Sequence, residues 1–275
     1  MQTLTFFQSL WATELRRWNE PERPVDERFE MVRADGWQGL CVDLGATTID
    51  EAWTYVPLYR RQGLRGLVTA FPKTIEDLRP AIHLAKEIDA PFVIGMMMPV
   101  KIDDMIETVR GWMKVAAEEG MPVQFETHRN CITNDLFSTL QMIEAIPDMR
   151  LAADLSHYVV QREMMQPITH DYQVMMRAIL DRCDSFQGRI GTRNQVQVPL
   201  DYPQYKIWVE TFRDWWTYGL KQWKSRAGEN DEVVFMSELG PTEYAMMDRN
   251  GEELSDRRLE ALELRRMVEN IWNTL

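Results

Sequence analysis

Short apolar runs alternate with amphipathic segments eight times along the chain, and the connections between them are short. The apolar runs have the length of strands, whereas the segments between them show helical periodicity and end at stop signals such as Gly36, Gly63 and Gly120. Repeated strand–helix units predict a parallel sheet, because parallel neighbours need a crossover connection. Eight units in 275 residues fit a closed (β/α)₈ barrel of the α/β class better than an open doubly wound sheet.

The predicted elements fill the chain without a domain break. The strands are expected within residues 4–12, 39–45, 64–71, 90–98, 121–128, 149–157, 185–191 and 232–239. The helices are expected at about 26–34, 48–61, 74–88, 103–119, 134–145, 172–182, 205–224 and 254–272. Pro80 is expected to bend or interrupt the third of these helices. The sequence therefore predicts one TIM barrel domain over residues 1–275.

Composition excludes several classes of partner. The formal net charge is −12, and the basic residues are scattered, so neither a nucleic acid nor an anionic membrane surface is an expected partner. No apolar stretch is long enough to span a bilayer, and no Gly-rich phosphate loop follows a strand. Cys41, Cys131 and Cys183 are too far apart for a CxxC site and odd in number, which favours a reducing, cytoplasmic location. We expect a small-molecule substrate.

Polar side chains follow the apolar residues at the ends of four consecutive predicted strands. They are Gln124, Glu126 and His128 on the fifth strand, Asp154 and His157 after the sixth, Gln187 and Arg189 on the seventh, and Glu238 on the eighth. The carboxyl ends of barrel strands form one face of the fold, so we expect these groups to converge there. Any one of them alone is more often a helix cap or a salt-bridge partner, but four in register favour an active site.

Four short motifs occur in a fixed order in the second half of the chain. They are Glu-x-His-Arg at 126–129, Asp-x-x-His at 154–157, x-x-Arg-x-Gly at 187–191 and Ser-Glu-x-Gly-Pro at 237–241. This order resembles that of the xylose isomerase-like TIM barrels, the sugar phosphate isomerase/epimerase group. The resemblance extends from the fifth strand almost to the C-terminus, whereas the first four units match in arrangement more than in motif.

The resemblance implies one divalent metal ion on the barrel axis. The implied ligands are Glu126, Asp154, Gln187 and Glu238. Gln187 departs from the family pattern, because related sequences read His-Ala-Arg where this chain reads Gln-Gly-Arg. An amide oxygen in place of an imidazole nitrogen favours a harder ion, Mn²⁺ or Mg²⁺, over Zn²⁺ or Co²⁺. The same substitution leaves open the loss of the metal.

The implied activity is the isomerisation or epimerisation of a carbohydrate, either a sugar or a sugar acid. Such a reaction removes a proton from carbon beside a carbonyl group, and the resulting enediolate needs a nearby cation. Two carboxylates can act as base and acid in turn, and the resemblance gives these catalytic roles to Glu126 and Glu238. His128, His157 and Arg189 are then expected to bind substrate.

Other interpretations of the same residues remain open. One is a non-catalytic sugar-binding or scaffold barrel with a degenerate metal site. Another is a phosphodiesterase of the apurinic endonuclease type, which four histidines and the negative charge disfavour. For Arg129 and Arg193, binding of a phosphate or carboxylate competes with an ion pair, which we favour in so acidic a chain. Aromatic residues at helical spacing within 208–216 fit packing against the barrel or the interface of a homo-oligomer.

Overall fold

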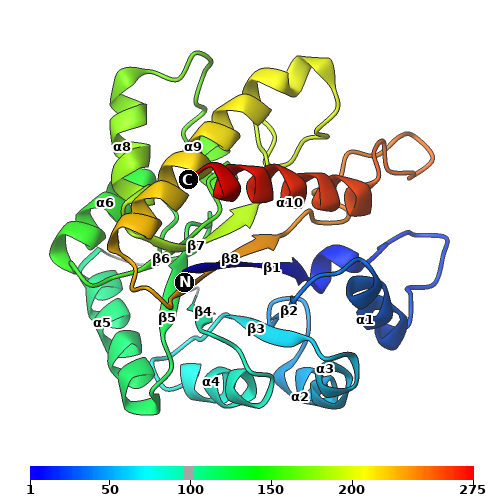
Figure 1. Ribbon diagram of the computed structural model, residues 1–275, viewed down its shortest axis with the longest axis horizontal. Helices are drawn as coiled ribbons and strands as arrows, with labels where there is room; N and C mark the ends of the chain where they lie inside the picture. The colour runs from blue at the N-terminus through cyan, green and yellow to red at the C-terminus, as the bar shows by residue number, and fades with distance from the viewer. Residues whose placement is uncertain (96–101) are drawn as a thin grey trace.

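The computed structural model describes residues 1–95 and 102–275, which form a closed barrel of eight parallel strands (Figure 1). The strands are β1 Thr3–Ser9, β2 Gly39–Asp43, β3 Arg65–Ala70, β4 Val93–Gly95, β5 Val123–Glu126, β6 Leu151–Ala153, β7 Cys183–Gly188 and β8 Glu232–Ser237. Their order round the barrel follows the chain, and β8 pairs with β1 to close it. The predicted (β/α)₈ fold is confirmed. Residues 96–98 of the predicted fourth strand lie outside the described residues.

Helices lie round the outside of the barrel (Figure 1). They are α1 Val25–Ala34, α2 Ile49–Thr54, α3 Val56–Gln62, α4 Leu78–Glu87, α5 Ile102–Glu119, α6 Leu136–Ala145, α7 Ser156–Gln161, α8 His170–Leu180, α9 Lys206–Arg226 and α10 Arg257–Thr274. Short 3₁₀ turns lie at Trp11–Thr13 and Pro203–Tyr205. None of the described helices is long and apolar enough to cross a membrane.

The strands separate two apolar layers, because their side chains point alternately inward and outward. Val234 and Met236 of β8 belong to the cluster inside the barrel, together with Phe7 of β1. Phe235, between them, belongs to the outer cluster and packs edge-on against Trp216 of α9. Burial on both faces explains why the strands read as continuous apolar runs. At the carboxyl ends of the strands, the side chains that point inward are polar instead of apolar.

The helix after β3 begins later than predicted. Residues 74–77 form a turn, and α4 starts at Leu78. Pro80 therefore lies in the first helical turn, where its missing N–H removes no intrahelical bond, and the predicted bend was wrong. The Thr74 amide donates to Asp77 Oδ2 at 2.9 Å, and the Asp77 amide donates to Thr74 Oγ1 at 3.3 Å. These two reciprocal hydrogen bonds close the turn that precedes the helix.

The predicted elements differ from the structure in three further respects. The first strand ends at Ser9, and the residues after it turn out of the barrel as a 3₁₀ segment. The helix predicted at 48–61 is two helices, because Pro57 cannot donate to the preceding turn and lies instead at the start of α3. The short helix α7 was not predicted.

The predicted packing role of the aromatic residues on α9 is borne out within the chain. Trp208, Phe212, Trp215 and Trp216 are all buried. Phe212 and Trp216 are fully covered, since each has 0% of its surface exposed. None of the three cysteines forms a disulfide, as the spacing predicted.

Glu260, in the first turn of α10, ties this helix to the segment after β7. Its side chain is 8% exposed and accepts a hydrogen bond from the Leu200 amide at 2.8 Å and one from Ser255 Oγ at 3.1 Å. Burial raises the pKa of Glu260 from 4.5 to about 7, and the two donors only partly oppose this. The folded chain therefore binds a proton that the unfolded chain has released over this pH range.

We predict that Glu260 makes the protein less stable as pH rises from about 4.5 to 7, since the folded state binds more protons there. Glu260→Gln should remove this dependence, so the free energy of unfolding of the variant should gain about 2 kcal/mol on the parent between pH 5 and pH 8, after allowance for partial hydration of the carboxylate. Urea unfolding at several pH values measures it. Glu144→Gln, exposed on α6 and not among the groups that shift the pKa of Glu260, is the control. Parallel pH profiles for parent and Glu260→Gln would contradict the prediction.

Candidate active site

The structure brings together the four groups that were predicted to converge. Glu126 is the last residue of β5, Asp154 follows β6, Gln187 is near the end of β7 and Glu238 follows β8. All four are buried, with exposed fractions of 2%, 0%, 2% and 7% in that order. Ligand oxygens of Glu126, Asp154 and Glu238 all lie within 4.8 Å of one another. Strand alternation turns Glu126 and Gln187 inward, since Phe125 and Phe186 belong to the outer apolar cluster.

A cavity of about 280 Å³ opens on this group from the carboxyl face of the barrel. Glu126, His128, Arg189 and Glu238 line it, as expected from the sequence. Its remaining wall was not predicted. That part of the wall is lined by Trp11, Arg16, Asp43, Gly45, Ala46, Phe71 and Tyr244.

Asp43 could have been found by the rule that found the other carboxylates. It ends the apolar strand β2, and its neighbour Cys41 lies in the inner cluster, so alternation turns Asp43 inward. Burial raises the pKa of Asp43 to about 6, although the amides of Gly45 and Ala46 donate hydrogen bonds to it. By contrast, no local pattern marks Tyr244, which lies in the irregular segment after β8.

Arg189 is the central cation of the site. Its side chain is 2% exposed, with Nη1 3.2 Å from Asp154 Oδ2 and Nη2 3.3 Å from Glu238 Oε2. Its Nε donates to the Glu238 backbone carbonyl at 2.8 Å. The guanidinium thus links the ends of β6, β7 and β8. The position fits the predicted substrate-binding role only in part, because all three of its side-chain nitrogens already contact groups of the protein.

Without a further cation, the charges in the site balance only if Glu126 and Glu238 keep their protons. Glu126, Asp154 and Glu238 carry three formal negative charges when ionised, and Arg189 offsets one. Burial raises the pKa of Asp154, but Arg189 and His157 outweigh this and hold it below its ordinary value. Burial, with Glu238 and Asp154 nearby, raises the pKa of Glu126 well above the ordinary range. Burial likewise raises the pKa of Glu238 to about 8, against the effect of Arg189. When both glutamates are ionised, two of the three negative charges remain uncompensated by Arg189, and one divalent cation would balance them.

Gln187 also fits a cation ligand. Both polar atoms of its side chain are buried, and its oxygen accepts no hydrogen bond from the residues that the structure describes. The side chain lies beside Glu126, where burial raises the pKa of that carboxyl and hydrogen bonding by Gln187 opposes the rise. A buried carbonyl oxygen without a donor is destabilising by about 1–3 kcal/mol, so this oxygen is available to a ligand. Carboxylate and amide oxygens are donors that Mg²⁺ and Mn²⁺ accept. The residues present therefore fit the metal that the sequence led us to expect.

His128 and His157 lie side by side above the carboxylates, with ring centroids 4.0 Å apart. Burial, assisted by the neighbouring imidazole, lowers the pKa of His128 to about 2, and burial also lowers the pKa of His157, so both rings are neutral. Nε2 of His157 lies 3.3 Å from Arg189 Nη1. The same nitrogen lies 3.3 Å from Asp154 Oδ2, which can only accept, so Arg189 favours one tautomer of His157 and Asp154 favours the other. His157 Nδ1 is buried and has no hydrogen-bond partner in the described chain.

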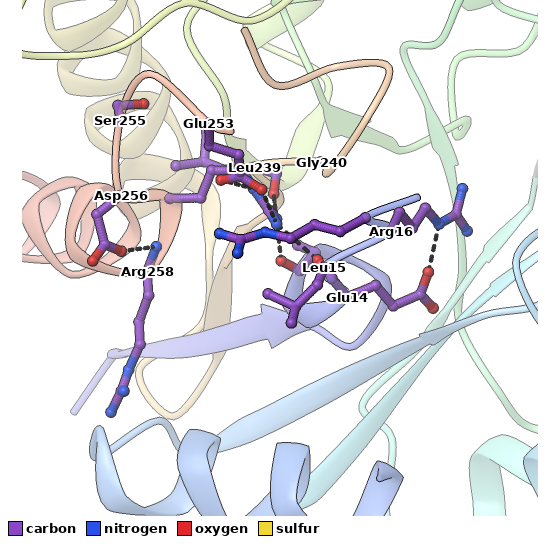
Figure 2. A network of polar contacts seen from close by, with 12 residues as sticks. Glu14, Leu15, Arg16, Leu239, Gly240, Glu253, Ser255, Asp256 and Arg258 are labelled. Carbon is purple, nitrogen blue, oxygen red and sulfur yellow. Dashed lines mark hydrogen bonds and ion pairs between the residues drawn. The ribbon is translucent and has the colours of Figure 1, made fainter. Parts of the chain in front are cut away.

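Arg257 joins two loops that border the cavity. It donates to the backbone carbonyls of Ala12 and Glu14 after β1 and, at 3.0 Å, to that of Leu239 after β8. Its guanidinium is held by Glu253, with two oxygen contacts of 2.8 Å. Figure 2 shows Glu14, Leu239 and Glu253 meeting in this network. Because the residue before Leu239 is the predicted catalytic glutamate, Arg257 fixes the backbone from which that side chain extends.

Solved structures share this barrel across nearly its whole length. A xylose isomerase-like TIM barrel protein from Mycobacterium smegmatis, solved in complex with magnesium, superposes with a TM-score of 0.65 at 13% identity, covering 98% of this chain and 97% of its own. The chain has the fold of the xylose isomerase-like TIM barrels. No family model matches the sequence, and no curated protein matches it.

Two sugar epimerases superpose almost as well. D-allulose 3-epimerase from Methylomonas sp. gives a TM-score of 0.61 at 13% identity, with 98% of each chain covered. D-psicose 3-epimerase from Clostridium cellulolyticum H10, solved with D-tagatose, gives 0.59 at 13% identity, covering 97% of this chain and 99% of the other. At this identity the likeness shows the fold alone.

We predict that the protein binds one Mn²⁺ or Mg²⁺ ion through Glu126, Asp154, Gln187 and Glu238. Asp154→Asn should weaken Mn²⁺ binding at least about tenfold, because it removes the carboxylate that stays ionised. Gln187→His should tighten binding and shift preference toward Zn²⁺, since imidazole is the softer donor. Calorimetric titration with each ion measures both effects.

The control for this titration is Asp148→Asn, which removes an exposed carboxylate from the same acidic chain. It should leave the affinity unchanged. Equal Mn²⁺ affinity in the parent and in Asp154→Asn would show that the ion binds elsewhere.

Proposed function

We propose that the protein is a divalent-metal-dependent isomerase or epimerase of a sugar or sugar acid. The observation that carries the proposal is the pair Glu126 and Glu238. These carboxylates extend from β5 and β8, which are not adjacent, and their oxygens approach within 4.8 Å in one buried cavity. Two acids held so close do not readily ionise together. One of them therefore keeps its proton and can act as the acid, while the other is ionised and can act as the base.

Glu126, Asp154, Gln187 and Glu238 would hold the metal ion. When bound, this ion supplies positive charge beside the substrate carbonyl, where negative charge develops in the transition state. Asp154 suits the role of permanent ligand, because Arg189 and His157 keep its pKa below the ordinary value. Gln187 adds an oxygen without adding charge.

The two glutamates then move the proton. In one direction, the ionised glutamate removes a proton from the carbon beside the carbonyl, and the C–H electron pair forms the new carbon–carbon double bond. The carbonyl electrons move onto oxygen, which gives the enediolate. The protonated glutamate then returns a proton to carbon from its own side. Return to the same carbon from the opposite side epimerises that centre. Return to the neighbouring carbon, with transfer of the hydroxyl proton of that carbon to the former carbonyl oxygen, isomerises the sugar.

The remaining polar groups orient the substrate. His157 Nδ1 has no partner in the described chain and can bind a substrate hydroxyl, which both donates and accepts, while Nε2 of the ring lies beside Arg189 and Asp154 on the other side. His128 lies against His157 and lines the cavity, so it borders the same part of the substrate. Neutral imidazoles here donate or accept without adding charge to the site. The shared fold of the D-allulose and D-psicose 3-epimerases supports this class of reaction.

We predict that the parent protein exchanges a carbon-bound proton for deuterium in D₂O with Mn²⁺ and a suitable substrate. A panel of ketoses and sugar acids, followed by NMR, reports exchange at the carbon beside the carbonyl. Glu126→Gln and Glu238→Gln should each slow exchange by about 10²–10⁴-fold, because an amide keeps the shape but cannot take the proton. Substrate affinity should fall much less, since the lost interaction belongs to the transition state.

Glu144→Gln, on the exposed face of α6, is the matched control and should exchange at the parent rate. Equal exchange by the parent and both active-site variants would refute the assigned mechanism. Absence of exchange with every sugar, in protein shown to hold Mn²⁺, would favour the binding-protein alternative.

A further inference from the structure

Arg129 has a half-buried cationic side chain with no counter-charge in the described chain. An ion pair was expected for both Arg129 and Arg193. Arg193 has one, with Nη2 2.9 Å from Glu163 Oε2. For Arg129 that expectation is not met, because the residues described include neither an acidic partner within 4.0 Å nor an acceptor for its side-chain N–H groups.

This combination sets Arg129 apart from the other arginines of the described chain. Those without an ion pair either project into solvent or, as Arg182 does, donate to a backbone carbonyl. An exposed guanidinium is satisfied by water, whereas a half-buried one loses part of that hydration. Five N–H donors in a planar fork are thus left available at a sheltered position.

Arg129 is held beside the cavity by an aromatic ring. Its guanidinium carbon lies 5.5 Å from the centre of the Tyr244 ring, and that of Arg189 lies 4.6 Å from the same ring. Tyr244 lines the cavity, as does His128, which directly precedes Arg129. Stacking on a ring fixes the direction of a guanidinium without neutralising it. Arg129 therefore presents its charge at the rim of the site, outside the group of carboxylates.

Arg16 provides an internal comparison. It also stacks on an aromatic ring of the cavity wall, 5.7 Å from the centre of Trp11. Its Nε, however, lies 2.6 Å from Glu14 Oε2, so its charge is already compensated. Both arginines stack on aromatic rings of the cavity wall, and of the two only Arg129 has no ion pair within the described chain.

We infer that the substrate carries a carboxylate or phosphate group and that Arg129 binds this group at the rim of the cavity. The reacting carbon then lies deeper, between Glu126 and Glu238, and the inference rests on the proposed function for that part. A planar guanidinium can bind either anion through two parallel hydrogen bonds. It also offsets the repulsion that an anionic substrate would meet from the carboxylates of the site.

The experiment compares binding of a neutral sugar with binding of anionic relatives. D-fructose, D-fructose 6-phosphate and D-gluconate are titrated calorimetrically into the parent, Arg129→Gln, Arg129→Lys and Arg193→Gln in one Mg²⁺ buffer. The parent should bind at least one anion about tenfold or more tightly than D-fructose. Arg129→Gln should weaken binding of that anion about 10–100-fold and change D-fructose binding less than about twofold. The anion affinity of Arg129→Lys should lie between those of the parent and Arg129→Gln, because lysine keeps the charge but lacks the planar fork of donors.

Arg193→Gln, which removes an exposed arginine outside the cavity wall, should bind all three ligands within about twofold of the parent. Preference for the phosphate alone identifies a sugar phosphate, and preference for D-gluconate alone identifies a sugar acid; both outcomes support the inference. Equal or weaker binding of both anions relative to D-fructose overturns it, as does a preference that survives Arg129→Gln. Thermal unfolding of each variant separates loss of binding from loss of fold.

The deuterium-exchange assay keeps this inference distinct from the proposed function. Exchange with neutral ketoses alone, at a rate unaffected by Arg129→Gln, overturns the anionic substrate and leaves the proton-transfer mechanism in place. Arg129-dependent anion binding without exchange of any substrate proton supports the anion site and counts against the mechanism.

Discussion

The guanidinium of Arg189 allows several carboxylates to be buried together inside the barrel. It extends from the chain just after β7 and contacts Asp154 after β6 and Glu238 after β8. Removing one partner from a buried, charged pair is destabilising by about 3–5 kcal/mol, because the other charge stays behind without compensation. The ends of three neighbouring strands are therefore fixed by one side chain, and the shape of the cavity depends on it.

This arrangement also makes chemically similar groups unequal. Asp154 lies against both Arg189 and His157, which keep it ionised despite complete burial. Burial, with two other acids nearby, raises the pKa of Glu126 although Gln187 and Arg189 act in the opposite direction. Glu238 lies between these extremes. One carboxylate is thus suited to hold a permanent charge, and the other two are suited to take up and release protons.

Local patterns in the sequence were enough to predict the barrel and most of the site. Apolar runs ending in polar residues identified Glu126, Asp154, Gln187 and Glu238, because the barrel places every strand end on one face. Boundaries near Pro57 and Pro80 were missed, since a proline can either break a helix or begin one and the sequence alone does not distinguish these cases.

Contacts between distant segments could not be predicted in this way. Arg257 reaches carbonyls of Ala12 and Glu14, far away in sequence, and an arginine early in a helix carries no local sign of such a role. The uncompensated charge of Arg129 was equally hidden, because the choice between an ion pair and a free guanidinium depends on which acidic side chains lie nearby. Asp43 is a different case. It lies at the end of an apolar strand, as the predicted site residues do, and could have been predicted in the same way.

β1 pairs with β8 to close the barrel, and Arg257 joins the segments that follow these two strands. This pairing determines when the site can form during synthesis. β1 leaves the ribosome first, but its partner follows more than two hundred residues later, with Thr3 beside Glu232 and Gln8 beside Ser237. Until then the nascent chain carries an unpaired strand edge, which invites pairing with other chains. Glu238 and Arg257 emerge later still. The cluster of carboxylates therefore cannot assemble until nearly the whole chain has been made, and a truncated product that ends before β8 lacks both Glu238 and the strand that pairs with β1.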